Sequence, residues 1–119
     1  MKYRLSETYL YLCEARLMQG DLAGAREAIN EVRRRAGATE LTSDSQMTVD
    51  FLLDERIREL VGEEQRRFTL LRLGKLLERT RKYNTEAGPA MKDYHVLWPI
   101  PQSIRDSNTG ADFPQNEGY

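Results

Sequence analysis

The sequence has a single cysteine, Cys13, so no disulfide bond can form within the chain. One thiol fits a reducing compartment and equally fits an exported protein that does without disulfides. Together with the single histidine, His95, it falls short of the several ligands that a metal site needs. A Cys13–His95 catalytic dyad is geometrically possible, but Cys13 lies on an apolar helix face, which favours a buried inert thiol. We expect no metal, no cofactor and no catalytic residue.

Long hydrophobic runs and an excess of charge of one sign are also missing. No stretch approaches the ~20 apolar residues of a membrane helix, and residues 1–7 lack the apolar centre of a signal peptide. The 18 Lys and Arg nearly balance the 19 Asp and Glu, so no global field attracts nucleic acid. Basic residues cluster at 33–35, at 66–67 and at Arg79, Arg81 and Lys82, but acidic residues neighbour each cluster, which favours ion pairing over phosphate binding.

Residues 3–36 show the apolar spacing of two helices. The stripe of the first helix contains Leu5, Tyr9, Leu12 and Cys13, and that of the second contains Leu22, Ala25, Ile29, Val32 and Ala36. Gly20-Asp21 separates them and Gly37 ends the second. The short turn predicts antiparallel packing, with Ala15, Ala25 and Ala28 allowing close approach. The pair resembles one tetratricopeptide (TPR) unit, which cannot bury both of its faces alone.

Residues 48–83 resume helical spacing, with a possible bend or break at Gly62. Apolar positions are Leu53, Ile57, Leu60 and Val61, followed by Phe68, Leu70, Leu71, Leu73, Leu76 and Leu77. Gly88-Pro89 ends any helix, and Trp98-Pro99-Ile100-Pro101 cannot be helical. The expected fold is all-α: a TPR-like helical hairpin, a second helical pair, and an irregular C-terminal tail rich in Pro, Gly and Asn.

A charged series accompanies the second helical pair. It consists of Glu55, Arg56, Glu59, Glu63, Arg66 and Arg72. Glycoside hydrolysis would need two carboxyl groups on opposite sides of a bond. The three glutamates are four residues apart and share one helix side, and Glu63 can pair with Arg66 three residues on. We therefore favour a structural ion-pair network that joins the helices to the tail.

Tyr94 and Trp98 could stack on sugar rings, because an aromatic surface suits the flat apolar face of a sugar. They flank the rigid Pro99-x-Pro101 element. The alternative, which we prefer, is that Trp98 pins the tail onto the helices.

Several short motifs stand in order along the chain. They include Tyr3-Arg4-Leu5-Ser6-Glu7, Gly20-Asp21, Asn30-Glu31-Val32-Arg33, Arg35-Ala36-Gly37, Glu55-Arg56, Glu59-Leu60, Gly62-Glu63, Arg66, Phe68, Leu70, Arg72, Gly74, Leu97-Trp98-Pro99-Ile100-Pro101, Asn108 and Gln115-Asn116-Glu117-Gly118-Tyr119. The ordered set resembles the C-terminal part of the SusD/RagB family of nutrient-binding outer-membrane lipoproteins. The resemblance covers essentially the whole chain, and its most specific part is the Pro-Ile-Pro run followed by Gln-Asn-x-Gly-Tyr.

The resemblance implies structural signature residues. It carries over no ligand-binding residue, because the sugar-stacking aromatics of the family generally lie on loops outside this segment. The signature residues are Glu55, Arg56, Glu59, Glu63, Arg66, Arg72, Trp98, Pro99, Pro101 and Asn116. Two positions depart from the family pattern: Thr69 stands at a usually acidic position and Glu117 at a usual proline. Thr69 is expected to remove one buried ion pair.

The resemblance also implies a function for the intact protein. It would be a surface-exposed outer-membrane lipoprotein that captures oligosaccharide or another nutrient and works with a TonB-dependent transporter. Residues 1–119 would be a scaffold fragment of it: a TPR-like pair at 3–37, a second helical pair at 48–83 and an extended tail at 84–119. The rival hypothesis is a free-standing TPR-like module that binds other proteins. Neither hypothesis makes the chain an enzyme.

Overall fold

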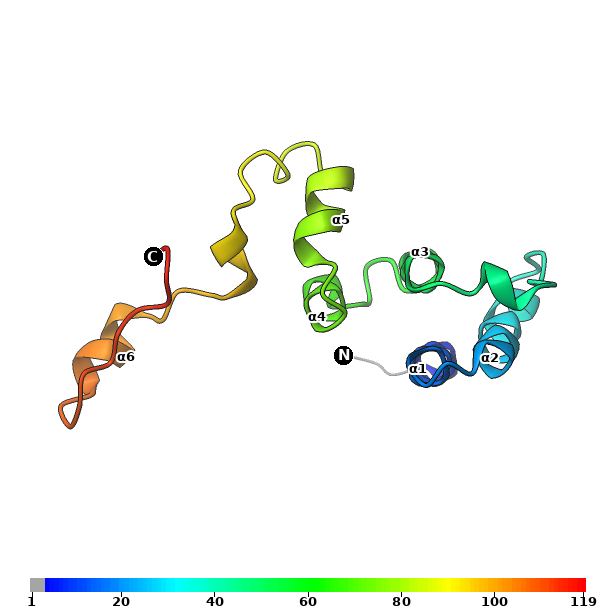
Figure 1. Ribbon diagram of the computed structural model, residues 1–119, viewed down its shortest axis with the longest axis horizontal. Helices are drawn as coiled ribbons and strands as arrows, with labels where there is room; N and C mark the ends of the chain where they lie inside the picture. The colour runs from blue at the N-terminus through cyan, green and yellow to red at the C-terminus, as the bar shows by residue number, and fades with distance from the viewer. Residues whose placement is uncertain (1–3) are drawn as a thin grey trace. The chain divides into compact units, whose positions relative to one another are not determined.

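The computed structural model describes residues 4–119, and within that range the chain is helical without a β-strand. Its helices are α1 (Leu5–Met18), α2 (Leu22–Arg35), α3 (Val49–Glu59), α4 (Arg66–Arg72), α5 (Leu76–Tyr83) and α6 (Gln102–Ser107), with short 3-10 turns η1 (Asp44–Gln46) and η2 (Asp93–Val96) (Figure 1). The expected all-α class is confirmed. No helix of the described range is long and apolar enough to cross a bilayer.

The chain divides into two compact units, one ending at Arg66 and the other running from Arg67 to Tyr119. The first unit contains α1, α2, η1 and α3, and the second contains most of α4 together with α5, η2 and α6. The expected beginning of the first helix and of the motif series at Tyr3 lies outside the described residues.

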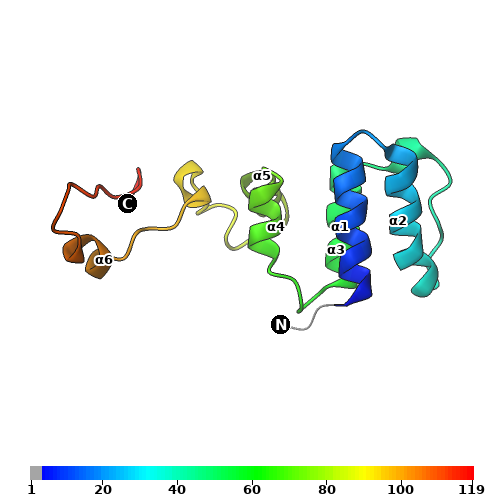
Figure 2. The same ribbon diagram turned by 90° about the horizontal axis from the view of Figure 1, so that it is seen from below.

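The first two helices form the expected hairpin, in which α1 and α2 lie side by side (Figure 2). The turn between them needs Gly20, whose φ of 79° is a left-handed conformation that other residues rarely adopt. Asp21 then caps α2, because its Oδ1 accepts a hydrogen bond of 2.9 Å from the Gly24 backbone N–H. The Gly20-Asp21 pair therefore ends one helix and begins the next.

The core of the first unit is built from α1, α2, α3 and the loop that connects α2 to α3. Its buried apolar residues are Leu10, Cys13, Ala25, Ala28, Ile29, Val32, Leu41, Met47, Leu52 and Leu60. The buried Asn30 side chain fastens the loop, donating to the Leu41 carbonyl at 3.0 Å and accepting from the Leu41 N–H at 2.8 Å. This reciprocal pair satisfies polar groups that burial would otherwise leave without partners.

Several residues expected in apolar stripes lie at the surface instead. They are Leu5, Leu12 and Ala15 of α1, Leu22 at the start of α2, Ala36 just after α2, Ile57 of α3, and Val61 two residues after α3. Helical spacing shows that residues share a face but does not show which face is covered. The core takes Leu10 and Cys13 from α1, which leaves the side with Leu5 and Leu12 uncovered.

Residues 48–83 form three helices, so the expectation of two is wrong in number. The break near Gly62 is present, since α3 ends at Glu59 and α4 begins at Arg66. A second break separates α4 from α5 at Gly74, where φ is 67° and the Lys75 N–H bonds back to the Leu70 carbonyl at 2.8 Å. This is the ordinary glycine closure of a helix.

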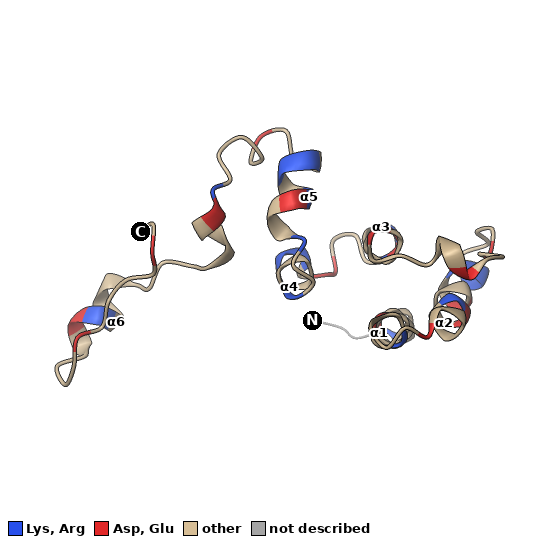
Figure 3. Cartoon of the chain, viewed as in Figure 1, with Lys and Arg blue, Asp and Glu red and all other residues tan. Residues whose placement is uncertain are grey.

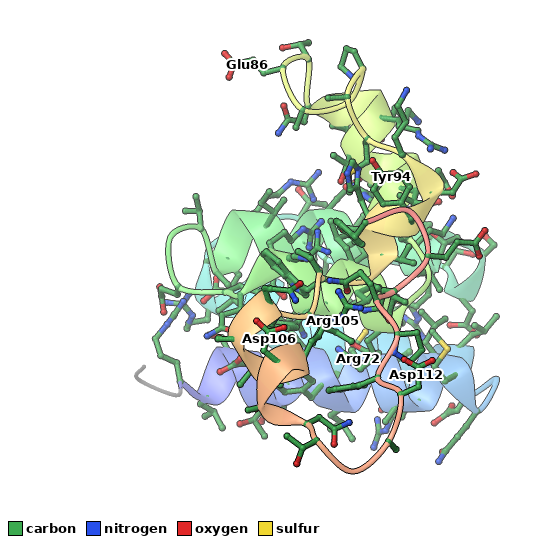
Figure 4. All side chains as sticks on the ribbon, turned by 90° about the vertical axis from the view of Figure 1, so that its left-hand side faces the viewer. Arg72, Glu86, Tyr94, Arg105, Asp106 and Asp112 are labelled. Carbon is green, nitrogen blue, oxygen red and sulfur yellow. The ribbon has the colours of Figure 1, made fainter. Side chains whose placement is uncertain are left out.

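The tail over 84–119 is mostly irregular, as expected, but it also contains the short elements η2 and α6. Pro101 immediately precedes α6, and its fixed φ suits the entry into a helix. Figure 4 shows Arg105 and Asp106 on α6 and Asp112 on the segment that returns from it. The Arg105 Nε donates to the Phe113 carbonyl at 3.1 Å, which holds that returning segment against α6.

Candidate functional site

Several residues of the predicted charged series form ion pairs in the first unit, and these pairs link α1, α2 and α3. Glu55 of α3 accepts from Arg33 of α2 at 2.6 Å and from Arg58, one turn along α3, at 2.9 Å. The carboxylate of Glu55 is buried, so two arginines compensate for its loss of water. Arg33 lies 22 residues from Glu55, and spacing within α3 could not have identified it.

Glu59 is the centre of a second group of ion pairs. It accepts from Arg4 at 2.9 Å and from Arg35 at 2.7 Å, and Arg4 also reaches Glu63 at 2.7 Å. Burial by itself would raise the pKa of Glu59, but Ser6, Arg35 and Arg4 together lower it below its usual value. We assign the lowering mainly to the arginines, because the Ser6 hydroxyl has no hydrogen bond of ordinary geometry within the part of the chain that the structure describes.

Arg56 points into the interior of the first unit. Its Nε donates to Glu64 at 2.6 Å, and its guanidinium lies 4.7 Å from the centre of the Tyr11 ring. Arg66 approaches the other oxygen of Glu64 at 3.3 Å. Glu64 was absent from the predicted series, which contained its neighbour Glu63, and a break in helical periodicity at Gly62 gives no signal to choose between them.

The remaining member of the series, Arg72, belongs to the second unit, at the end of α4. Glu55, Glu59 and Glu63 are each held by at least one arginine, and for Glu59 these contacts lower the pKa. A general acid requires the opposite, a carboxyl group whose pKa is raised. This arrangement suits the joining of helices and not proton transfer.

The three consecutive arginines of α2 are all paired with acidic residues. Arg33 pairs with Glu55 and Arg35 with Glu59, while Arg34 contacts both Glu31 and Glu40. Acidic and basic residues adjoin along α2 in Figure 3. The pKa of Glu40 is lowered by its hydrogen bond to Arg34. These pairs leave the arginine run without the free positive stripe that phosphate binding uses.

Cys13 and His95 lie in different units. Burial raises the pKa of the Cys13 thiol to about 12, and its sulfur contacts that of Met47 at 3.9 Å. A thiol of this kind is a poor nucleophile, because the thiolate is the reactive form. His95 accepts a hydrogen bond from the Lys92 backbone N–H through Nδ1 at 2.9 Å. Among residues 4–119, no cluster of three or more potential ligands could hold a metal ion.

The second unit contains a hollow of about 390 Å³ beside the tail. Its lining consists of Arg67, Ala87, Ala90, Met91, His95, Leu97, Trp98, Pro99 and Tyr119. The size lies within the range of small-molecule pockets, and the lining is mainly apolar with few polar groups. It is the candidate contact surface of this unit, and two predicted residues, Trp98 and Pro99, form part of its wall.

Arg67 supports this wall from α4. Its guanidinium lies 4.5 Å from the centre of the Trp98 ring, and its Nη2 donates to the His95 carbonyl at 2.6 Å. The Trp98 side chain is nevertheless 63% exposed. Trp98 therefore contacts a helix on one side, through a cation–π pair, and offers apolar surface on another. Arg67 was not among the predicted residues, since only tertiary folding brings it to Trp98.

Comparisons with known proteins agree with these features. The SusD family profile matches residues 1–119. The chain is 36% identical over 111 residues to the SusD-like protein P25 of Formosa agariphila, with 83% of this chain and 20% of that protein covered. The chain thus spans 20% of the length of that relative. No solved structure matches the chain. On the match over its full length, the chain belongs to the SusD family.

Proposed function

We propose that this chain is a scaffold segment of a SusD-like surface lipoprotein that works with a TonB-dependent transporter in oligosaccharide uptake. The family match over residues 1–119 carries the proposal. SusD-like proteins in general are glycan-binding lipoproteins of the outer-membrane surface that partner such transporters. Because the chain spans 20% of its relative, we assign nutrient and transporter contacts to the whole protein. Residues 3–37, 48–83 and 84–119 would supply a hairpin, a helical base and a tail.

The uncovered side of α1 supports a scaffold role. Leu5 and Leu12 are exposed on it, and because they are seven residues apart they lie almost in line along the helix. A helix with apolar residues on two sides is normally covered on both. The exposed side of α2, by contrast, carries charged residues (Figure 3). We infer that further polypeptide of the same protein covers α1.

The ion pairs of the first unit support a binding protein and not an enzyme. The SusD family is a family of binding proteins. Glu55 and Glu59 are each shared between two arginines, which suits the fastening of helices to each other. These pairs would keep the helical base rigid while the nutrient is held elsewhere in the intact protein.

The direct test is affinity purification of the full protein that contains this chain, extracted from the outer membrane of its host. We expect a TonB-dependent transporter to co-purify, and we expect the protein to bind at least one oligosaccharide of a glycan panel in calorimetry. Release of reducing ends from starch, xylan or mannan would instead indicate a glycoside hydrolase. Absence of both transporter and glycan binding would contradict the proposal.

A pair of variants separates scaffolding from ligand contact. Leu12→Glu places a charge on the uncovered side of α1, and Ala23→Glu places the same charge on the exposed side of α2. In the full protein, Leu12→Glu should lower the yield of folded protein and leave the glycan affinity of the folded fraction unchanged. Ala23→Glu should change neither. A selective loss of glycan affinity in Leu12→Glu would assign ligand contact to α1 and contradict the scaffold role.

The rival hypothesis, a free-standing TPR-like interaction module, makes a different prediction. The isolated 119-residue chain would then retain specific peptides in a pull-down experiment. Retention of a defined peptide, lost on Leu12→Glu, would favour that hypothesis over the scaffold.

A further inference from the structure

The C-terminal residues fold back onto the extended segment Leu97–Ile100. The side-chain carboxamide of Gln115 bonds twice to Ile100, accepting from its N–H at 2.8 Å and donating to its carbonyl at 2.9 Å. This is the pattern in which a neighbouring strand would engage one residue of a β-ladder. A side chain thus takes the place of a backbone partner.

Two further side chains continue this pattern. The Asn116 Nδ2 donates to the Trp98 carbonyl at 2.7 Å, and the Tyr119 hydroxyl donates to the Leu97 carbonyl at 2.8 Å. Trp98 and Ile100 are two residues apart, so their backbone groups face the same edge of an extended segment. Gln115 and Asn116 therefore occupy that edge, while Tyr119 bonds to a residue of the other edge.

The second edge offers no free N–H group to another strand. The Leu97 N–H bonds to the Tyr94 carbonyl at 3.1 Å, and Pro99 has no N–H to donate. An extended segment with free backbone groups on an edge would invite another strand. This segment can therefore contact a partner mainly through side chains, above all the exposed Trp98.

Gly118 allows the C-terminal residues to pass close to Tyr94. A Cβ atom at this position would collide with the Tyr94 ring, and the φ of Gly118 is 94°. The glycine lets Tyr119 pass Tyr94 and pack edge-on against it, with ring centres 5.0 Å apart. Tyr94 lies on the η2 turn that precedes the extended segment (Figure 4).

We propose that Gln115, Asn116 and Tyr119 form a clasp, defined by their four hydrogen bonds to Leu97, Trp98 and Ile100, that replaces a neighbouring β-strand and positions Trp98 on the wall of the hollow. The Gln-Asn-x-Gly-Tyr motif is then a positioning element of the folded unit, and its partner is the Trp-Pro-Ile-Pro motif. This inference concerns the second unit alone and goes beyond the scaffold function proposed above.

Trp98 is the only tryptophan, so its fluorescence anisotropy reports directly on how firmly the clasp holds it. In the 119-residue chain, Gln115→Met removes both bonds to Ile100, whereas Glu117→Met introduces the same side chain at an exposed position of the same motif. We expect Gln115→Met to lower the anisotropy and to speed hydrogen exchange of the Ile100 amide by about tenfold, the loss of one net hydrogen bond. Glu117→Met should leave both unchanged.

Tyr119→Phe tests the clasp without altering Gln115. It removes only the hydroxyl that donates to Leu97, and it keeps the ring against Tyr94. We expect a smaller fall in Trp98 anisotropy than in Gln115→Met. Slow amide exchange in α1 and α2 would verify that the first unit stays folded in every variant. Anisotropy and Ile100 exchange that are the same in Gln115→Met, Tyr119→Phe and Glu117→Met would overturn the proposal.

Discussion

Arg56 is a fully buried cation, and its surroundings compensate for that burial only in part. Its Nε bonds to Glu64 and its guanidinium stacks on Tyr11, but both terminal nitrogens are buried without a hydrogen-bond partner among residues 4–119. Desolvation of a charged pair can exceed its mutual attraction, so such a pair gives little net stability. Removal of one partner alone is far more damaging, since the other charge stays buried.

We predict that Arg56→Ala lowers the free energy of unfolding by about 3–5 kcal/mol, because it leaves the Glu64 carboxylate buried without this partner. The control is Arg58→Ala on the same helix, whose exposed side chain pairs with Glu55 and should contribute less than about 1 kcal/mol. Urea denaturation measures both. The double variant Arg56→Met with Glu64→Leu should recover most of the loss. Equal effects of Arg56→Ala and Arg58→Ala would contradict this account.

The helices of the first unit depend on local signals at their ends. Gly20 and the Asp21 cap separate α1 from α2, and Thr48 caps α3 by accepting from the Phe51 N–H at 3.1 Å. A cap of this kind typically contributes about 1 kcal/mol. These signals are local in sequence, which is why the position of the hairpin turn could be predicted.

We predict that Gly20→Ala lowers the free energy of unfolding by about 1–2 kcal/mol. The reason is purely conformational: the φ is positive and no atom lies within 4 Å of an added Cβ, so the substitution meets no steric clash. Gly20→Asn should lower the stability less, since asparagine tolerates the left-handed region. Thermal or urea unfolding distinguishes the two. Equal losses for alanine and asparagine would point to a cause other than backbone conformation.

For the molecule as a whole, the decisive feature is the uncovered side of α1. Leu5 is 71% exposed there, and Leu12, seven residues on, is exposed on the same side. Exposed apolar surface on a helix side is typical of an interface or a site of aggregation. Under the function proposed above, this surface packs against further polypeptide of the same protein.

We predict that the isolated chain self-associates through this side of α1 in a concentration-dependent manner. The double variant Leu5→Gln with Leu12→Gln should shift the chain toward monomer and reduce binding of a hydrophobic dye. Ala23→Gln, on the exposed side of α2, should do neither. Size-exclusion chromatography with light scattering gives the masses. A monomeric wild-type chain with a cooperative melt and no dye binding would be inconsistent with an uncovered apolar side.

The helix boundaries could be predicted from the sequence better than the ion-pair partners could. The breaks at Gly20 and Gly62 were visible as interruptions of helical spacing, whereas the break at Gly74 was hidden within a continuous leucine pattern. Glu55 and Glu59 were identified as members of an ion-pair network, but their partners Arg33 and Arg4 come from distant parts of the chain. Spacing along one helix carries information about that helix and none about its neighbours.

The amino-acid sequence by itself determined the helical class, the hairpin turn, the non-helical Trp98–Pro101 segment and the family, because these depend on local spacing, backbone restriction and ordered motifs. Only the tertiary structure decided which side of α1 is buried, that Glu64 and not Glu63 holds Arg56, and that Gln115 bonds to Ile100. Each of these depends on how separate elements of the chain meet, which is settled by packing and not by local preference.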